Sequence, residues 1–443
     1  MVPFVSGQNL GFLPISKGVA RGIVMRCRPV WIVVLVSTLL CAGPSVAGDW
    51  PQFRGPNRDG ISDETGLLRQ FPDGGPEVLW STPVGQGYAS AAIHSGRVYF
   101  ADYDEPTYEW LVRCLTLDEG KELWRFKEKR RIRPNHGITR AVPATDGKFV
   151  FALDPKATLH ALDAATGKEL WRKNFVQDYG TKIPPWYNGQ NPLIEKDRVL
   201  VAPAGTSALV VALDKATGEE IWRTPNQVGW LLSHASLMPV ELGGVKQYLF
   251  SVLQGTVGIA AEDGKLLWHF PFKFNVSVSP SPLAIDDERV FVTAAYESGG
   301  AMFRVKHEGG SWSTEQIFVY GADEWNSECQ TPILMDGHIF AVGKKRRGLF
   351  TCLDLNGKTV WDSDGHASFG LGAFILADGM FLILEGKTGL LRLLDANTKE
   401  YKELAQAQVL SGHDVWGPPA LSDGKLVIRD FGKMVCIDMK KKG

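Results

Sequence analysis

The chain has 443 residues, of which 44% are hydrophobic and 22% are charged, so it can bury a sizeable core and is unlike a disordered protein. Its 48 basic and 49 acidic residues give a net charge of -1, which argues against a general nucleic-acid binder because such proteins are basic. The 48 glycines and 14 tryptophans indicate many tight turns between aromatic-rich strands.

Residues 1–47 have the layout of a secretory signal peptide. Arg26 and Arg28 precede a short apolar run, and the small residues that follow it end at Ala47. Because the run is short for a bilayer, we expect cleavage after Ala47 and a periplasmic or secreted protein without a transmembrane span. An uncleaved membrane anchor is the alternative, and Met25 is a possible true start.

Eight short turns, each followed by a strand with alternating apolar residues, recur along the chain. The second residues of successive turns are 42 to 51 positions apart. Asp-Gly and Gly-Gly pairs at such places are strong hairpin signals. Eight copies at this period predict an all-β, eight-bladed β-propeller of four-stranded antiparallel blades. The turns are Ser95-Gly96, Asp146-Gly147, Lys196-Asp197, Gly243-Gly244, Asp287-Glu288, Asp336-Gly337, Asp378-Gly379 and Asp423-Gly424.

The ends of the chain are predicted to close the ring. Seven outer strands can be counted, including weak matches around Phe318 and at Tyr401. The eighth is expected at residues 77–82, beside residues 434–439, because closure removes exposed sheet edges. The predicted organisation is therefore a signal peptide over 1–47, an extension over 48–75 that packs across the base or stays loose, and a propeller over 76–443.

The stretch from Ala161 to Trp171 reads Ala-x-Asp-x-x-Thr-Gly-Lys-x-x-Trp and resembles the tryptophan-docking motif of pyrroloquinoline quinone (PQQ)-like β-propellers. Residues 212–222 resemble it again, and residues 49–60 resemble the segment leading into such propellers. These propellers belong to the quinoprotein alcohol dehydrogenase-like superfamily, which also includes the non-catalytic outer-membrane protein assembly lipoproteins. The resemblance implies that six tryptophans pack between neighbouring blades: Trp80, Trp124, Trp171, Trp222, Trp268 and Trp361.

The cysteines after residue 47 are interpreted as core residues. Cys114, Cys352 and Cys436 occupy equivalent places on strands of different repeats, which should not touch. We therefore expect small buried thiols, with a disulfide as the alternative.

The connectors between one blade and the next are predicted to surround the mouth of the central channel. They carry polar and aromatic residues, which make the mouth the candidate ligand site; polar loops that only face water are the alternative. The candidate ligand-binding residues are Tyr88, His136, Asn188, Gln190, His234, Asn326, Glu328, His366, His413 and Trp416. Gln86, Trp186, Tyr187, Asn275 and Gln330 lie in the same connectors.

Two classes of function fit this pattern. The first is an exported, non-enzymatic binding or scaffold module for envelope proteins or polymers, with no cofactor and an undefined oligomeric state. The second is a quinoprotein dehydrogenase that uses PQQ and Ca²⁺ to oxidise an alcohol or sugar. Calcium would then be held by Glu328 and Asn188, with Asn326 as a further oxygen donor and Asp414 as a possible base.

The chain departs from the dehydrogenases in three respects. It has no adjacent cysteine pair and no Cys-x-x-Cys-His haem motif, and it is shorter than those enzymes generally are. The resemblance is therefore nearer to the assembly lipoproteins, and the first function is favoured. A hydrolase or lyase built on the same propeller is a third hypothesis for the function.

Overall fold

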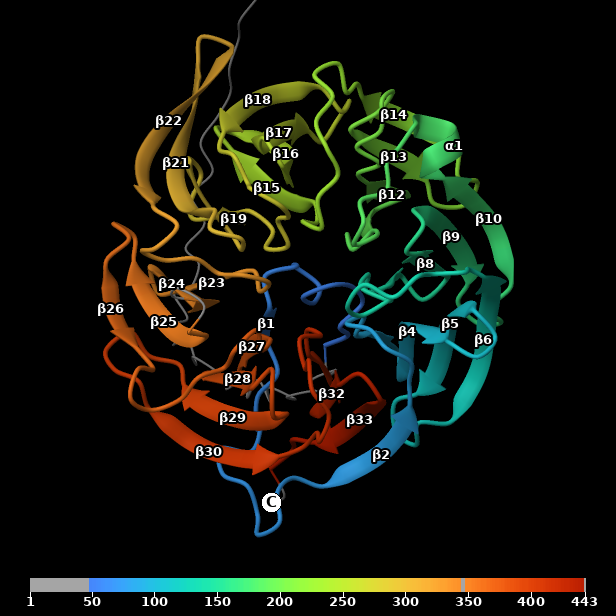
Figure 1. The fold of residues 1–443 in the computed structure, drawn as a ribbon, viewed down its shortest axis with the longest axis vertical. Coiled ribbons are helices and arrows are strands. Elements are labelled where there is room, and N and C mark those ends of the chain that lie inside the picture. The colour runs from blue at the N-terminus through green and yellow to red at the C-terminus, as the bar shows by residue number, and fades with distance from the viewer. Residues whose placement is uncertain (1–47, 344–346, 442–443) are drawn as a thin grey trace, which may run out of the picture. The chain divides into compact units, whose positions relative to one another are not determined.

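The computed structural model describes residues 48–343 and 347–441. These residues form eight β-sheets arranged around a ring (Figure 1). Six sheets are built from consecutive antiparallel strands alone, and each of the other two combines later strands with one strand from the N-terminal part of the described chain. The predicted eight-bladed propeller is confirmed. The predicted leader over 1–47 lies outside the described residues.

Blades 1 to 4 follow one another along the chain. Blade 1 contains β3 (Ala91–His94), β4 (Arg97–Asp104), β5 (Glu109–Thr116) and β6 (Glu122–Lys129). Blade 2 contains β7 (Ala144–Thr145), β8 (Phe149–Leu153), β9 (Thr158–Asp163) and β10 (Glu169–Asn174), followed by the short helix α1 (Phe175–Tyr179). Blade 3 contains β11 (Leu193–Glu195), β12 (Arg198–Val201), β13 (Val210–Asp214) and β14 (Glu220–Thr224). Blade 4 contains β15 (Met238–Leu242), β16 (Val245–Val252), β17 (Gly255–Ala260) and β18 (Leu266–Pro271).

Blades 5 to 8 complete the ring. Blade 5 contains β19 (Leu283–Ala284), β20 (Arg289–Ala294), β21 (Gly299–Glu308) and β22 (Ser311–Tyr320). Blade 6 contains β23 (Ile333–Met335), β24 (His338–Gly343), β25 (Leu349–Asp354) and β26 (Thr359–Asp362). Blade 7 contains β27 (Phe374–Ala377), β28 (Met380–Leu384), β29 (Leu390–Asp395) and β30 (Glu403–Gln408), with β1 (Ile61–Ser62) added parallel to β27. Blade 8 contains β31 (Ala420–Ser422), β32 (Lys425–Arg429), β33 (Lys433–Asp438) and β2 (Val78–Pro83).

The ring closes as the sequence predicts. Strand β2 pairs antiparallel with β33, with Ser81 opposite Val435, so an N-terminal strand forms the outer edge of the last blade. All eight predicted turns join the first and second strands of a blade. In blade 6, Asp336 and Gly337 have φ values of +49° and +67°, the left-handed pair that a two-residue hairpin requires. Among the described residues, no helix is long and apolar enough to cross a membrane.

The tryptophans on the outer strands contact the next blade in most cases. The indole Nε1–H groups of Trp80, Trp124 and Trp171 donate to carbonyl oxygens in the following blade, at 2.7 to 3.1 Å. Trp222 instead lies against the turn glycine Gly264 without a hydrogen bond from its indole to the described residues. These contacts seal the interfaces between the early blades of the ring.

Later blades depart from this arrangement. Trp268 donates to the Gln247 side chain of its own blade at 2.7 Å, so it is not docked like the others. The sequence predicts Tyr401 in an outer strand, but that strand begins at Glu403. Tyr401 lies in the turn before it and faces Trp361 of the preceding blade, with ring centroids 6.2 Å apart. It thus occupies the place where the early blades have a glycine.

The extension before the propeller crosses the centre of the ring, where the blue chain runs in Figure 1. Trp50 pairs with Ile93 of blade 1 through two backbone hydrogen bonds. Further along, the Arg58 side chain bonds to blade 3 and the Arg54 side chain to blade 6. Strand β1 then joins blade 7. We call residues 49–62 the plug because they hold opposite sides of the ring together from within.

The two plug arginines are buried and bonded to oxygens of amide groups. Arg54 donates to the carbonyls of Thr331 at 2.7 Å and Pro332 at 3.0 Å. Arg58 donates to the carbonyls of Asn191 and Pro192. Burial lowers the pKa of Arg54 to about 10; burial and the charge of Arg54 lower that of Arg58 to about 9, so both stay charged at neutral pH.

A belt of side-chain hydrogen bonds links neighbouring blades where the inner strands begin. The Asn191 Nδ2–H donates to the Ser236 hydroxyl at 2.8 Å. The Ser236 N–H donates to the Ser281 hydroxyl, and the Ser281 N–H donates to the Thr331 hydroxyl, at 3.0 and 2.9 Å. These residues occupy equivalent positions in blades 3 to 6, and their bonds fix the inner radius of the ring.

Candidate functional site

A cavity of about 610 Å³ lies where the connectors between blades meet around the plug. Each of the eight connectors supplies at least one wall residue, which confines the space from all sides of the ring. Phe53 of the plug also lines it, together with Tyr296 from the turn between β20 and β21. The lining residues are Phe53, Tyr88, Asn135, His136, Arg140, Trp186, Gly189, Asn191, His234, Ser277, Ser279, Ala295, Tyr296, Glu328, Cys329, Gln330, Leu371, Trp416 and Pro418.

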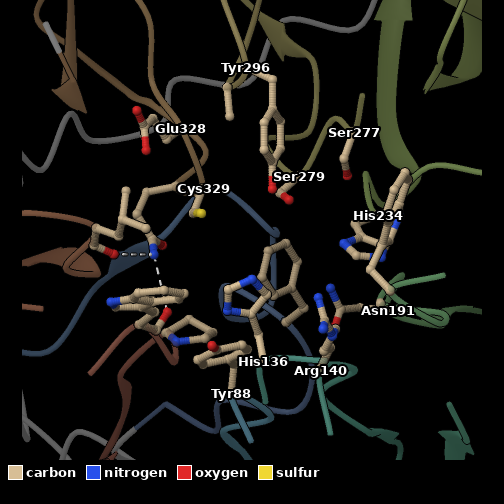
Figure 2. Close-up of a pocket in the computed structure, with 18 of the residues that line it drawn as sticks. Tyr88, His136, Arg140, Asn191, His234, Ser277, Ser279, Tyr296, Glu328 and Cys329 are labelled. Carbon is tan, nitrogen blue, oxygen red and sulfur yellow. Dashed lines mark hydrogen bonds between the residues drawn. The ribbon is translucent and has the colours of Figure 1, made fainter. Parts of the chain in front are cut away.

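The structure brings half of the predicted site residues together in this cavity (Figure 2). They are Tyr88, His136, His234, Glu328 and Trp416. Two other residues that the sequence places in the connectors, Trp186 and Gln330, also line it. The Gln330 amide donates to the carbonyls of Leu371 and Trp416, both at 3.1 Å, and so ties three connectors together.

Three predicted residues are buried behind the cavity wall and are used for backbone support. The Asn188 side-chain oxygen accepts the N–H of Gln190 at 3.1 Å. The Gln190 side chain brackets Ala202, donating to its carbonyl and accepting its N–H. The Asn326 amide donates to the Ala294 carbonyl at 3.3 Å. These amides satisfy connector backbone groups that burial would otherwise leave without partners.

The remaining two predicted ligand residues, and the possible base Asp414, fall outside the cavity lining. His366 stacks on Tyr401 with ring centroids 5.0 Å apart, away from the ring centre. His413 is 73% exposed and its Nδ1 lies 3.6 Å from the Asp414 carboxylate. Asp414, the proposed base, therefore stands beside an exposed imidazole rather than among the cavity walls.

Several cavity residues were not singled out from the sequence. Arg140, Asn191, Ser277 and Ser279 lie in predicted connectors, and their polar character is the signal that could have identified them. Tyr296 comes from a turn on the same face; its φ of +55° is unusual for a bulky residue but is invisible in the sequence.

The charged wall of the cavity is formed by Arg140. Its Nε donates to the Gly137 carbonyl at 3.1 Å and its Nη2 to the Asn135 carbonyl at 2.6 Å. These bonds hold the guanidinium at the end of its own connector, and among the described residues its Nη1 forms no hydrogen bond. Burial lowers the pKa of Arg140, yet it remains a cation at neutral pH.

His234 is a neutral polar wall. Burial, followed by the charge of Arg140, lowers its pKa to about 4. Its Nε2 lies 3.0 Å from the Tyr187 carbonyl, which can only accept, so Nε2 carries the proton and Nδ1 is an acceptor. His234 therefore adds no charge to the site near neutral pH.

An aromatic shelf forms another wall. The rings of Tyr88 and Trp416 stack with centroids 4.9 Å apart at an angle of 15°. Phe431 packs against Tyr88 at 5.2 Å, and the Arg140 guanidinium lies over the Tyr88 ring at 5.9 Å. The shelf offers a flat apolar surface next to a cation, a combination that suits a ring-shaped ligand with polar substituents.

The predicted calcium set is not assembled. Of its two principal members, Glu328 lines the cavity whereas Asn188 faces the connector backbone. Across residues 48–343 and 347–441, no three His, Cys, Asp or Glu side chains are grouped so as to hold a metal ion. Ca²⁺ takes six to eight oxygen ligands, and the predicted pair of Glu328 and Asn188 does not come together to supply them.

The fold and the cavity define a class, the PQQ-like β-propeller with a ligand-sized space at its mouth. The chain belongs to the PQQ_2 family, described as outer membrane protein assembly factor BamB, which matches residues 109–363.

Similar proteins fall into two groups. The outer membrane protein assembly factor BamB of Yersinia pestis is 21% identical over 91% of this chain and 97% of its own length. A 1-butanol dehydrogenase (cytochrome c) of Thauera butanivorans is 27% identical over 44% of this chain, and the match spans about a quarter, 27%, of that enzyme's length.

Solved structures give the same two groups. BamB from Moraxella catarrhalis superimposes with a TM-score of 0.58 at 15% identity, covering 83% of this chain and 98% of that one. Quinohemoprotein alcohol dehydrogenase from Comamonas testosteroni gives 0.59 at 12% identity, covering 89% and 81%. At these identities the likeness concerns the fold, so the function has to be argued from the site.

Proposed function

We propose that this protein is an exported binding module of the cell envelope, which holds its ligand in the mouth cavity without converting it. The observation that carries the proposal is the cavity of about 610 Å³ with walls from all eight connectors. Cavities of this size suit a small molecule or the end of a polymer. The ring of blades keeps the walls in fixed positions, so little ordering is needed on binding.

Two further observations support the proposal. The relative that matches this chain over almost its full length is named an assembly factor of the outer membrane, not an enzyme. The arrangement of residues 1–47 is that of an export signal. Together they favour a periplasmic or envelope location, envelope proteins or polymers as partners, and binding that needs no cofactor.

A quinoprotein dehydrogenase is the second candidate, favoured by the local identity of 27% over 204 residues to the butanol dehydrogenase. Against it stand the unassembled calcium set and the lone Cys329 in the cavity, where the dehydrogenase resemblance implies an adjacent cysteine pair. The two candidates differ in a direct measurement, because Trp186 and Trp416 line the cavity and report on its occupancy through their fluorescence.

Titration of the purified protein with PQQ and Ca²⁺ separates the candidates. The binding-module proposal expects no saturable quenching up to about 1 mM, a concentration at which the binding free energy is only about 4 kcal/mol in magnitude. It also expects no dye-linked oxidation of alcohols or sugars. Quenching that a chelator abolishes, accompanied by dye reduction, would replace the proposal with the dehydrogenase.

Binding itself is tested by sedimenting the protein with isolated envelope polymers and outer-membrane fractions. Trp416→Ala removes half of the aromatic shelf and is expected to release the protein from its target. Trp312→Ala is the matched control, because Trp312 stacks on His307 in the hairpin of blade 5, outside the cavity lining. Equal binding by both variants would show that the mouth is not the working site.

A further inference from the structure

The balance of charge around the mouth cavity is positive on one side. Arg140 is the cation in the wall. Directly behind the wall, Arg58 donates to the carbonyl of Asn191, itself a lining residue. The hydrogen bonds of Arg58 go to amide oxygens rather than to carboxylates, whereas Arg54, in the same plug, bonds to blade 6 and does not belong to this side. Buried charges in a low-dielectric setting act over longer distances than exposed ones, so this wall attracts an anion.

The cavity also has hydrogen-bonding groups that lack partners within the described part of the chain. The Trp186 Nε1–H and the Ser277 hydroxyl are buried and have no bond to the described residues. A buried donor without a partner costs about 1 to 3 kcal/mol. A ligand rich in oxygen acceptors recovers that loss, and both residues line the space that such a ligand would enter.

The walls have different chemistry at opposite ends. Figure 2 shows Arg140 on one side of the cavity and Glu328 on the other, with the ring of Tyr296 projecting between them. A carboxylate near Arg140 is attracted, whereas a second negative group near Glu328 is repelled. The Glu328 end instead suits hydroxyl groups, which can donate to its oxygens. A ligand that fits has one anionic end, a hydroxyl-bearing end and flat apolar faces for the Tyr88–Trp416 shelf.

From this arrangement we infer that the mouth cavity binds an acidic sugar, with its carboxylate at Arg140, its hydroxyl groups toward Glu328 and a ring face on the shelf of Tyr88 and Trp416. The inference rests on the proposed function and names its ligand class. The acidic sugar can be the end of an envelope or extracellular polymer or a free sugar acid, since both present the same carboxylate and hydroxyl groups.

Calorimetric titration of the full chain with a trimer of two galactose units and one terminal galacturonic acid tests the inference, with the methyl ester of the same trimer as the uncharged control. The acid is expected to bind at least about tenfold more tightly than the ester, the range of a hydrogen bond between charged groups. A titration with the galacturonate monomer distinguishes the two sources. Equal affinity for monomer and trimer indicates a free sugar acid, and tighter binding of the trimer indicates a polymer end.

Three variants assign the contacts. Arg140→Gln is expected to remove the preference for the acid over the ester. Arg133→Gln is the control on the same connector, because Arg133 is exposed and does not line the cavity. Arg140 also supports the carbonyls of Asn135 and Gly137, so Trp186→Phe serves as the second test. It keeps an aromatic ring, removes only the N–H donor, and is expected to weaken both trimers about threefold to tenfold.

The outcomes separate the inference from the proposed function. Equal binding of acid and ester, weakened alike by Trp186→Phe, overturns the acidic ligand and leaves a binding module. Absence of binding at about 1 mM overturns the inference that the ligand is an acidic sugar. The sedimentation experiment with envelope fractions then decides whether the protein is a binding module. Growth of the ultraviolet absorbance of an unsaturated uronate would show that the protein cleaves the sugar. The inferred ligand class would then stand, and the proposal that the ligand is held without conversion would be overturned.

Discussion

The indole of Trp171 in blade 2 lies directly on Gly218 in blade 3, and its Nε1–H donates to the Lys215 carbonyl at 3.1 Å. A Cβ atom built on Gly218 would stand 2.7 Å from the indole ring. Gly218 also has a φ of +74°, so both its backbone and its surroundings require the absence of a side chain. The contact shows why a glycine follows each docked tryptophan by about one blade.

Gly218→Ala is predicted to destabilise the protein by about 2 to 4 kcal/mol, because it adds backbone strain and displaces the indole. The control is Gly337→Ala, at a φ of +67° with no atom within 4 Å of the added Cβ, which carries the strain of about 1 to 2 kcal/mol alone. Urea unfolding measures both. Equal losses in the two variants would mean that the tryptophan contact is not what requires the glycine.

Replacement of Arg58 by methionine is predicted to loosen the plug. The carbonyls of Asn191 and Pro192 lose their donor, at a cost of about 1 to 3 kcal/mol, offset in part because a charge need no longer be buried. Hydrogen exchange over residues 49–62 should accelerate. Arg69→Met is the control, because Arg69 forms an exposed ion pair with Asp395 that is worth at most about 1 kcal/mol. Unchanged exchange in Arg58→Met would contradict the role of the plug arginine.

The buried group around His160 is predicted to make stability depend on pH. Burial alone would lower the pKa of His160, but the Asp154 and Glu169 carboxylates outweigh it and raise the pKa above 6.5. Burial would raise the pKa of each carboxyl, yet His160 and nearby arginines lower them, below 3.8 for Asp154 and 4.5 for Glu169. The stabilisation from His160 is complete below about pH 6.5 and is lost as pH rises through its raised pKa.

The carboxylates act in the opposite direction: their stabilisation is present above about pH 4.5 and is lost as pH falls through their lowered pKa values. Stability from this group is therefore greatest between about pH 4.5 and 6.5. Unfolding free energies measured from pH 4 to 9 should decline above pH 6.5 in the native protein, and this decline should be weaker in His160→Gln. His338→Gln, outside the group, should keep the native profile. Identical profiles for His160→Gln and the native protein would contradict the prediction.

The cysteines of the described chain are predicted to react slowly. All four are free, and burial, the largest cause in each case, raises the pKa of each thiol to about 12. The thiolate is the reactive form, so little alkylation is expected at pH 8 in the folded protein and full alkylation in urea. Site-by-site mass spectrometry measures the reaction. Fast labelling of Cys329, which lines the cavity, would show that its surroundings are more open than described.

The blade count and ring closure could be predicted because they depend on local signals. Asp336-Gly337 and its counterparts in blades 1, 4, 7 and 8 adopt left-handed backbone angles that few other dipeptides tolerate, so each marks a hairpin. The placement of Tyr401 was wrong for the converse reason. An aromatic ring can dock on the next blade, or it can lie at the place where the docked tryptophan of the preceding blade makes contact. The spacing of residues along the chain does not distinguish these two positions.

The site could be predicted only to the level of the connectors. Asn188 and Asn326 are polar and near the ring centre, yet they support buried backbone groups, a task that uses the same residue types as ligand binding. Phe53 reaches the cavity from the plug, whose path depends on the long-range bonds of Arg54 and Arg58. No periodic pattern encodes such a path.

The central claim is that the cavity between the connectors and the plug holds the ligand. Hydrogen exchange of the protein with and without the trimer that ends in one galacturonic acid tests it most directly. The account predicts protection in the connectors that line the cavity, around His136, Trp186, Ser277 and Glu328, and none in the hairpin tip of blade 5. Protection confined to the outer strands or to that hairpin, with the connectors unchanged, would contradict it.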